Sequence, residues 1–238
     1  MSFSFDSKIR YSESDIEGCL TLSALLNYFQ DCSTFQSESL DVGIRYLKER
    51  HMVWVLSYWQ IDIERYPRFC EEVEIGTFPT SFRHFLGTRN FYMKEKSGKY
   101  LAKANSLWSL LDTDTMKPTI PPQDMINRYL IEDKLDMEYL PRKVGVPCGG
   151  SMAEPVVVRS HHLDTNRHVN NGQYVNMAMD YLPKEFAGTV IRRLRAEYRM
   201  QAFLGDVLYP YVAVEGDTAT VSLQDQGGNP YVNIAFSR

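Results

Sequence analysis

The hydrophobic and polar positions of the first half predict one strand, one helix and then several long strands. Residues Ser4 to Tyr11 alternate as a short strand, and a polar turn, ESDIEG, leads into the helix. The apolar residues of this helix recur at helical spacing: Leu22, Leu25, Leu26 and Phe29. Its expected N-cap is Thr21 or Ser23. The run MVWVLSYWQIDIERYP is rich in β-branched and aromatic residues and is stopped by Pro67. Three further runs, VEIGTFPTSF, HFLGTRNFYMKEK and YLAKANSLWSLLD, predict successive antiparallel strands.

The second half repeats this order of elements. A short strand, VVVRS, precedes the polar loop HLDTNRHVNNG and the helix QYVNMAMDYLP. The run VIRRLRAEYRMQAF predicts a long strand. Three more strands follow in VLYPYVAVEG, ATVSLQDQ and YVNIAFSR, with GGN as a tight turn between the last two.

The two halves can be aligned with one gap, and the alignment indicates an internal repeat. An offset of 149 residues places Asp15 on Asp164, Asn27 on Asn176 and Asp31 on Asp180. Beyond the gap, the strand after the helix aligns less closely, with Arg65 on Arg199 and Phe69 on Phe203. Each half then has the elements to wrap a curved antiparallel sheet around one helix. We therefore expect an α+β fold with an N-terminal domain at 1–112, a linker at 113–154 and a C-terminal domain at 155–238.

The linker is punctuated by proline and glycine, in TIPPQDM, LPRKVGVP and CGGS. The run IEDKLDMEYL inside it predicts a short helix.

Composition narrows the classes of function. The chain has 238 residues and a formal charge of −4, which argues against nucleic acid as a partner. No apolar run approaches the roughly 20 residues that cross a bilayer, so no membrane insertion is expected. The four cysteines show no CxxC spacing, and neither a metal nor an organic cofactor is indicated. The polar N-terminus resembles neither an export signal nor a transit peptide, so the expected location is cytoplasmic.

The loop of the second half concentrates polar residues just before the helix. It holds the following within eight residues: Asp164, Asn166, His168, Asn170 and Asn171. In the aligned loop of the first half, Glu17 stands opposite Asn166 and Cys19 opposite His168. Since only the second loop has an imidazole and a carboxamide, the sequence predicts one active site per chain.

These residue types suit attack by water on a carbonyl carbon. A histidine with a pKa of about 6.5 is a natural general base, and a carboxamide can hold the water or stabilise an oxyanion. Asn170, Asn171 and the backbone of Gly172 at the helix start are expected to contact the substrate. Asp164 either orients the His168 ring or acts as the base itself. The alternative is that these polar residues have no catalytic role and only cap the helix, for which Asn171 is well suited.

The segment HLDTNRHVNNGQYVNMAMDYLP resembles the signature of the acyl-acyl carrier protein (ACP) thioesterases, which has the form LDxNxHVNNxxY followed by a helix. EYRMQAFLGDVL and YSESDIEGCLTLSALLNYFQ resemble two further blocks of that family. The resemblance implies a double hotdog fold and hydrolysis of fatty acyl-ACP to free fatty acid and ACP. By position, Asp164, Asn166 and His168 inherit the catalytic roles of the family.

One block departs from the plant members of the family. Where they carry adjacent glutamate and cysteine, this sequence has Gln201 and Ala202. A cysteine nucleophile is therefore unavailable at this point. We expect direct attack by water, with Gln201 holding the water by hydrogen bonds, and the general base remains either His168 or Asp164.

The resemblance also defines partners and alternatives. ACP is acidic, so its docking site should be basic, and two groups are candidates: Arg192, Arg193, Arg195 and Arg199, or Arg142 and Lys143. By analogy with other hotdog proteins, the acyl chain should lie between helix and sheet. An acyl-CoA thioesterase, a hotdog hydratase and a non-catalytic acyl sensor are the alternatives. A homodimer is left open, because the internal repeat could replace it.

Overall fold

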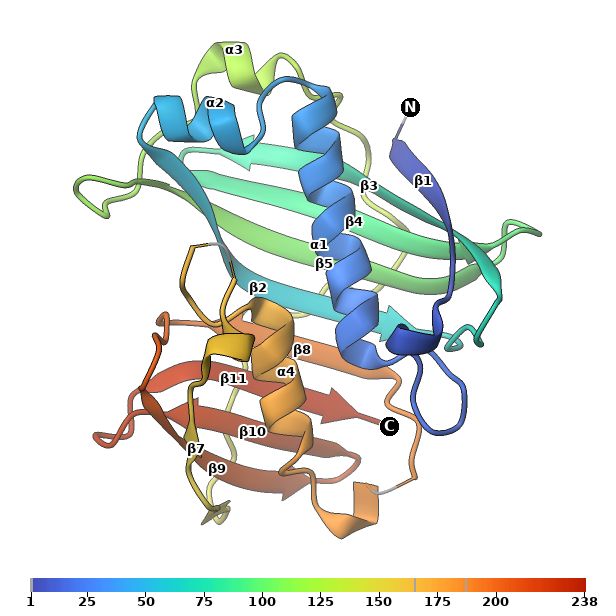
Figure 1. Cartoon of the computed structure of the whole chain (residues 1–238), viewed down its shortest axis with the longest axis vertical. Helices are drawn as coiled ribbons and strands as arrows, with labels where there is room; N and C mark the ends of the chain where they lie inside the picture. The colour runs from blue at the N-terminus through green and yellow to red at the C-terminus, as the bar shows by residue number, and fades with distance from the viewer. Residues whose placement is uncertain (1, 165, 187) are drawn as a thin grey trace. The chain divides into compact units, whose positions relative to one another are not determined.

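The computed structural model describes residues 2–164, 166–186 and 188–238, and the chain divides into two compact units (Figure 1). The N-terminal unit comprises Met1–Ser57 and Ile63–Tyr139. The C-terminal unit comprises Tyr58–Asp62 and Leu140–Arg238, so one short stretch of the first half of the sequence belongs to it. No helix in the described part of the chain is both long and apolar enough to cross a membrane.

The N-terminal unit is an antiparallel sheet with one long helix. Its strands are β1 (Phe3–Lys8), β3 (Glu72–Arg83), β4 (Leu86–Glu95) and β5 (Tyr100–Asp112), in this spatial order, followed by the part of β2 (Met52–Ile63) that belongs to this unit. The helices are α1 (Leu22–Ser39), α2 (Ile44–Glu49) and α3 (Gln123–Ile126), and a short 3-10 turn, η1, covers Tyr11–Glu13.

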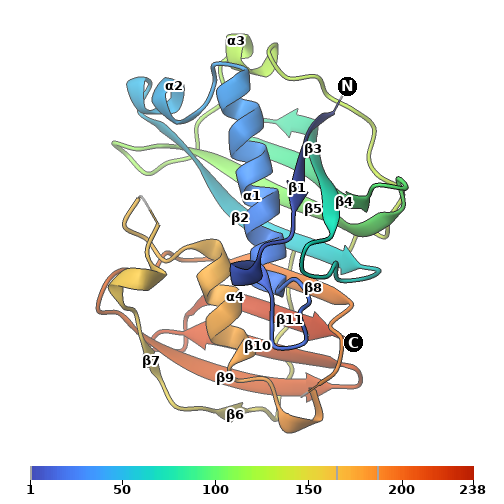
Figure 2. The ribbon, with the colours of Figure 1, turned by 45° about the vertical axis from the view of Figure 1, so that its right-hand side comes forward.

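Helix α1 packs against β1 and β3, as Figures 1 and 2 show. Of the two residues predicted as its N-cap, Thr21 takes this role, because its side chain accepts a hydrogen bond from the Ala24 N–H at 3.2 Å. The residues predicted for its apolar face, Leu22, Leu25, Leu26 and Phe29, are all buried. Phe29 is fully enclosed and contacts Phe91 of β4, with 5.5 Å between ring centroids. Truncating such a ring to alanine costs about 3–5 kcal/mol.

The C-terminal unit repeats this plan with a shorter helix. Residues Tyr58–Asp62 of β2 pair antiparallel with β8 (Arg193–Tyr198), which is followed by β11 (Pro230–Ser237), β10 (Thr218–Gln224), β9 (Val207–Glu215) and β6 (Ser151–Met152). The strand β7 (Val156–Val157) also pairs with β9. Helix α4 (Asn171–Met179) packs on β10 and β11, and two 3-10 turns cover Ser160–His162 (η2) and Lys184–Phe186 (η3). The strand predicted over VIRRLRAEYRMQAF is confirmed only from Arg193 to Tyr198.

The hydrogen bonds of the two units confirm the offset of 149 residues but correct the alignment beyond the gap. Leu20 N–H donates to Pro67 O, and the matching Val169 N–H donates to Ala202 O. Position 67 therefore corresponds to 202, an offset of 135. The predicted matches of Arg65 with Arg199 and of Phe69 with Phe203 are wrong by one residue. Side-chain identity favoured the shifted alignment, whereas backbone pairing decides the true one.

The segment between β5 and β6 is bound to the sheets by buried polar side chains. In the N-terminal unit, Asn90 Oδ1 accepts from the Leu135 N–H at 3.1 Å and from the Tyr139 hydroxyl at 2.9 Å. In the C-terminal unit, Gln60 Oε1 accepts from the Leu140 N–H at 3.0 Å. The helix predicted over IEDKLDMEYL is wrong, because this stretch has no helix and its Leu135 and Leu140 N–H groups donate to side chains of the sheets. The predicted domain boundaries stay a prediction.

Candidate active site

The loop before α4 is organised by the carboxylate of Asp164. Its Oδ1 accepts hydrogen bonds from the backbone N–H groups of Asn166 at 2.8 Å and of His168 at 3.3 Å. The backbone closes the same turn, because the Asp164 N–H donates to His168 O at 2.8 Å. The carboxylate thus fixes the two residues that carry the candidate catalytic side chains, and within the described part of the chain its hydrogen bonds are to their backbone.

The corresponding loop of the N-terminal unit has the same geometry. Asp15 Oδ1 accepts from the N–H groups of Glu17 and Cys19, both at 2.9 Å. In both loops the residue before the last donor has a left-handed backbone, with φ of 72° at Gly18 and 64° at Arg167. The two loops are therefore equivalent scaffolds that differ in the side chains they present.

The start of α4 is capped by Asn170. Its Oδ1 accepts from the Gly172 N–H at 2.8 Å, so Asn170, and not Asn171, is the capping residue. Asn171 becomes the first residue of the helix, and the Gly172 N–H is engaged in the cap. Contact of Asn170, Asn171 and Gly172 with a substrate stays a prediction.

The side chain of His168 is half-buried and lies against Phe203. The two rings meet edge to face, with 4.9 Å between their centroids. This contact brings the segment that follows β8, which contains Gln201, beside the loop of Asp164. Asn166 is exposed, and within the described residues its carboxamide and that of Gln201 form no hydrogen bond to the protein. Both are therefore available to a water or a substrate oxygen.

Two buried tyrosines support this arrangement by hydrogen bonds. No motif in the sequence marks either of them as functional, and the only available indication is that a buried hydroxyl needs a hydrogen-bond partner. Tyr174 of α4 accepts a hydrogen bond from the Ala202 N–H at 2.8 Å. Tyr198 of β8 donates to Asn171 O at 3.1 Å, and its ring lies 6.0 Å from that of Tyr174. Burial raises the pKa of both phenols, so both act as neutral hydroxyls. They fix the start of α4 and the segment of Gln201 relative to each other.

Two further groups have shifted pKa values. His162 accepts a hydrogen bond from the Arg159 N–H at Nδ1, at 2.9 Å, and burial together with His161 and Arg159 lowers its pKa. Burial raises the pKa of the Cys32 thiol to about 12, so it is not a source of thiolate. Within the described residues, no group of three histidine, cysteine or acidic side chains could hold a metal ion.

Two of the arginines predicted to dock ACP are committed to the C-terminal unit itself. Arg193 forms an ion pair with Asp62. Arg195 donates to the carbonyl oxygens of Pro141 at 2.6 Å and Lys143 at 2.9 Å. Both therefore hold the fold together, whereas Arg199 is exposed and lies 3.9 Å from Glu197.

Comparison with known proteins gives consistent matches along the chain. Residues 1–129 match the acyl-ACP thioesterase N-terminal domain, and residues 148–227 match the acyl-ACP thioesterase C-terminal domain. A chloroplastic acyl-[acyl-carrier-protein] hydrolase of Cuphea viscosissima is 25% identical over 90% of this chain and 55% of its own length. A chloroplastic oleoyl-acyl carrier protein thioesterase of Arabidopsis thaliana is 24% identical over 92% of this chain and 65% of its own. The chain thus spans less than two thirds of these relatives.

Solved structures show the same fold. An acyl-ACP thioesterase from Bacteroides thetaiotaomicron superposes with a TM-score of 0.90 at 24% identity, covering 98% of this chain and 96% of that one. A 12:0-ACP thioesterase from Umbellularia californica gives a TM-score of 0.86 at 22% identity, with coverage of 99% and 96%. These matches confirm the α+β hotdog architecture. Because one family model covers more than half of its residues and a second covers most of the rest, this chain belongs to the acyl-ACP thioesterase family.

Proposed function

We propose that this protein hydrolyses the thioester of fatty acyl-ACP, releasing free fatty acid and the ACP thiol. The observation that carries the proposal is the asymmetry of two equivalent loops in a chain of this family. The loop of Asp164 presents Asn166 and His168, whereas the loop of Asp15 presents Glu17 and Cys19 on the same backbone.

The proposed chemistry uses water as the nucleophile. The water oxygen bonds to the thioester carbonyl carbon while its proton passes to the His168 imidazole. The tetrahedral intermediate then expels the thiolate as the carbon–sulfur bond breaks, and the thiolate takes up the proton from the imidazolium. Asn166 and Gln201 would hold the water or donate to the oxyanion, since their carboxamides are uncommitted to the protein.

The role of Asp164 in this proposal is to position the loop. Its Oδ1 is occupied by two backbone N–H groups, one of which belongs to His168 itself. The His168 ring, by contrast, makes no hydrogen bond to the protein within the described residues, so its nitrogens are available to a water. We therefore assign the general base to His168.

The test compares wild type, His168→Ala and the matched variant Cys19→Ala on acyl-ACPs of graded chain length and on the same acyl groups carried by CoA. We expect acyl-ACP to be hydrolysed in preference to acyl-CoA, a loss of at least about 100-fold in kcat in His168→Ala, and little change in Cys19→Ala. Preference for acyl-CoA would make the protein an acyl-CoA thioesterase. Binding of acyl-ACP without turnover would make it an acyl sensor, and full activity of His168→Ala would overturn the assignment of the base.

A further inference from the structure

A mixed basic and apolar surface surrounds the candidate catalytic loop in the C-terminal unit. It consists of six residues, which we term the loop surface: Arg159, Arg167, Arg199, Met200, Phe203 and Leu204. The three apolar side chains are 39%, 51% and 62% exposed, in chain order. All three arginines are exposed as well. Exposed apolar side chains next to each other and rimmed by charge are typical of interaction sites.

Backbone pairing brings the segments of the loop surface together. The Gly205 N–H donates to Val158 O at 3.1 Å, which joins the segment of Leu204 to that of Arg159. The Val169 N–H donates to Ala202 O at 3.0 Å, which joins the loop of Arg167 to the segment of Phe203. Because the Phe203 ring also contacts the His168 ring, the loop surface is continuous with the candidate active site.

The matching region of the N-terminal unit provides an internal comparison, and its charge is different. There the equivalent positions hold five acidic and three basic residues: Glu13, Asp15, Glu17, Glu64 and Glu71 with Arg10, Arg65 and Arg68. In the C-terminal unit the same positions hold two acidic and three basic residues: Asp164 and Asp206 with Arg159, Arg167 and Arg199. One unit is therefore net acidic in this region and the other net basic, in a chain whose formal charge is −4.

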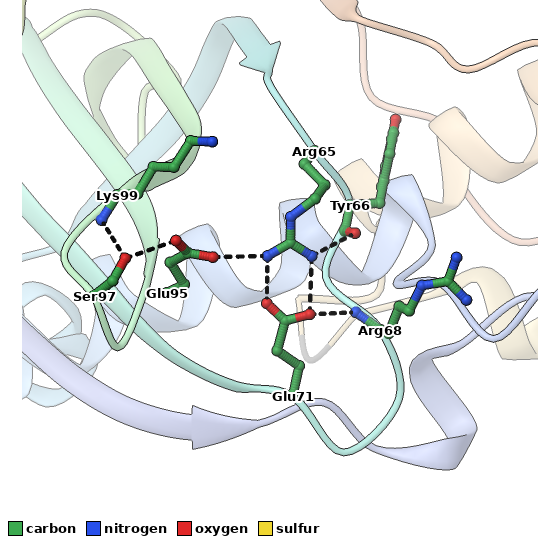
Figure 3. A network of polar contacts seen from close by, with 7 residues as sticks. All are labelled: Arg65, Tyr66, Arg68, Glu71, Glu95, Ser97 and Lys99. Carbon is green, nitrogen blue, oxygen red and sulfur yellow. Dashed lines mark hydrogen bonds and ion pairs between the residues drawn. The ribbon is translucent and has the colours of Figure 1, made fainter.

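Internal ion pairs increase this difference in charge, because they engage a basic side chain of the N-terminal region. In the N-terminal unit, Arg65 binds both carboxylate oxygens of Glu71, at 2.5 and 2.9 Å, and Glu95 at 3.0 Å (Figure 3). The position of Arg65 corresponds to Met200 in the C-terminal unit. Asp206, which corresponds to Glu71, accepts from the Phe203 N–H at 2.8 Å and leaves the nearby arginines without a bidentate partner.

Arg167 adds a conformational argument. It has φ of 64°, a left-handed backbone that costs a non-glycine residue roughly 1 kcal/mol, and the equivalent position in the other loop is Gly18. Within the described residues its guanidinium has no hydrogen bond or ion pair. Because Arg167 is strained and its guanidinium makes no internal contact, glycine at this position would stabilise the fold at least as well. Such strain is typical of functional positions.

We propose that the loop surface is the docking site for the acidic acyl carrier, with Arg159, Arg167 and Arg199 facing its carboxylates and Met200, Phe203 and Leu204 forming the apolar centre of the contact. The inference rests on the proposed function for the identity of the partner. Charge complementarity favours an acidic protein over a nucleotide-bearing thioester, because an apolar centre offers little to a phosphorylated ribose. Docking here would deliver the thioester directly beside His168.

The test uses two variants, Arg167→Gly, which introduces the residue found in the equivalent loop, and Leu204→Asp. The control is Lys184→Glu, at an exposed lysine of the same unit. Two quantities are measured: the Kd for holo-ACP without an acyl group, and kcat/KM for acyl-ACP relative to the same acyl group on N-acetylcysteamine. We expect each variant to weaken holo-ACP binding and to lower the relative kcat/KM by about three- to tenfold, with no effect of Lys184→Glu. Added salt should weaken ACP binding more in wild type than in Arg167→Gly.

The melting temperature separates docking from folding. Arg167→Gly should melt no lower than wild type, because glycine relieves the left-handed strain. Unchanged holo-ACP affinity in both variants would overturn the loop surface as the docking site, even if acyl-ACP is hydrolysed. If both variants weaken holo-ACP binding but the wild type hydrolyses no thioester, the docking site is retained and only the proposed function is refuted.

Discussion

The equivalent aspartates Asp164 and Asp15 allow the structural and catalytic contributions of a loop carboxylate to be separated. Each Oδ1 accepts two backbone N–H groups, at 2.8 and 3.3 Å for Asp164 and at 2.9 Å twice for Asp15. Substitution by alanine removes both bonds in either loop. Hydrogen bonds to a charged acceptor are worth about 1.5–3 kcal/mol each when buried. Because both loops are at least partly exposed, we expect a loss of about 1–2 kcal/mol of unfolding free energy in each variant.

The catalytic consequences should differ. Asp164→Ala releases the backbone of Asn166 and His168, and a misplacement of about 1 Å in a catalytic group costs about 100-fold in rate. Asp15→Ala releases only Glu17 and Cys19, so its kcat should stay within about twofold of wild type. Urea unfolding gives the stability change, and steady-state hydrolysis of acyl-ACP at saturation gives kcat.

Asp164→Asn distinguishes positioning from base catalysis. The asparagine oxygen still accepts the two N–H groups, so a positioning role predicts that much of the activity survives and that the pH profile keeps its shape. If Asp164→Asn is as inactive as Asp164→Ala while retaining wild-type stability, Asp164 is the general base and our assignment is wrong. An equal loss of kcat in Asp15→Ala would refute the reasoning from the loop geometry altogether.

Two further predictions concern the supports of the fold. Tyr174→Phe leaves the buried Ala202 N–H without its acceptor, so it should lower the unfolding free energy by about 1–3 kcal/mol. It should also reduce kcat, because the segment of Gln201 is held less firmly. Unchanged kcat with lowered stability would show that this hydrogen bond has only a structural role. Glu71→Gln weakens the bidentate pair with Arg65 and should cost about 1 kcal/mol at pH 7, whereas Glu49→Gln on an exposed helix should cause no measurable change. Because Arg65 lowers the pKa of Glu71 below its ordinary value of 4.5, the carboxylate stabilises the fold above that pH, and this contribution is lost as the pH falls through the lowered pKa. A difference in unfolding free energy between wild type and Glu71→Gln that is undiminished at pH 3 in urea unfolding would contradict this pairing.

Much of the fold could be predicted because its pattern is local. The apolar spacing of α1 and its Thr21 cap, the alternation in the long strands, and the GGN turn between β10 and β11 all depend on neighbours within a few residues. The helix predicted over IEDKLDMEYL failed because its alternatives are not local. The Leu135 N–H and the Leu140 N–H bond to Asn90 and Gln60, which lie far away in the sequence.

In the candidate site, too, some features could be predicted from the sequence and others depend on contacts between distant segments. The loop motif identified Asp164, Asn166 and His168 from residue type and spacing, and the repeat identified which of the two loops carries an imidazole. It could not indicate that Asp164 binds backbone N–H groups, because a carboxylate that orients a ring and one that caps a turn have the same sequence signature. Tyr174 and Phe203 were missed as parts of the site for a related reason, since each acts on a segment about 30 residues distant.

The sequence by itself determined that the chain repeats one α+β plan and that one of its two loops carries imidazole and carboxamide chemistry, because periodicity and composition are properties of the chain. Only the tertiary structure decided the register of the repeat, the commitment of Arg193 and Arg195 to internal contacts, and the gathering of Arg159, Arg167 and Arg199 around the loop. These outcomes depend on which backbone groups find partners across the sheets, and hydrogen-bond pairing between distant segments is fixed only when the chain is folded.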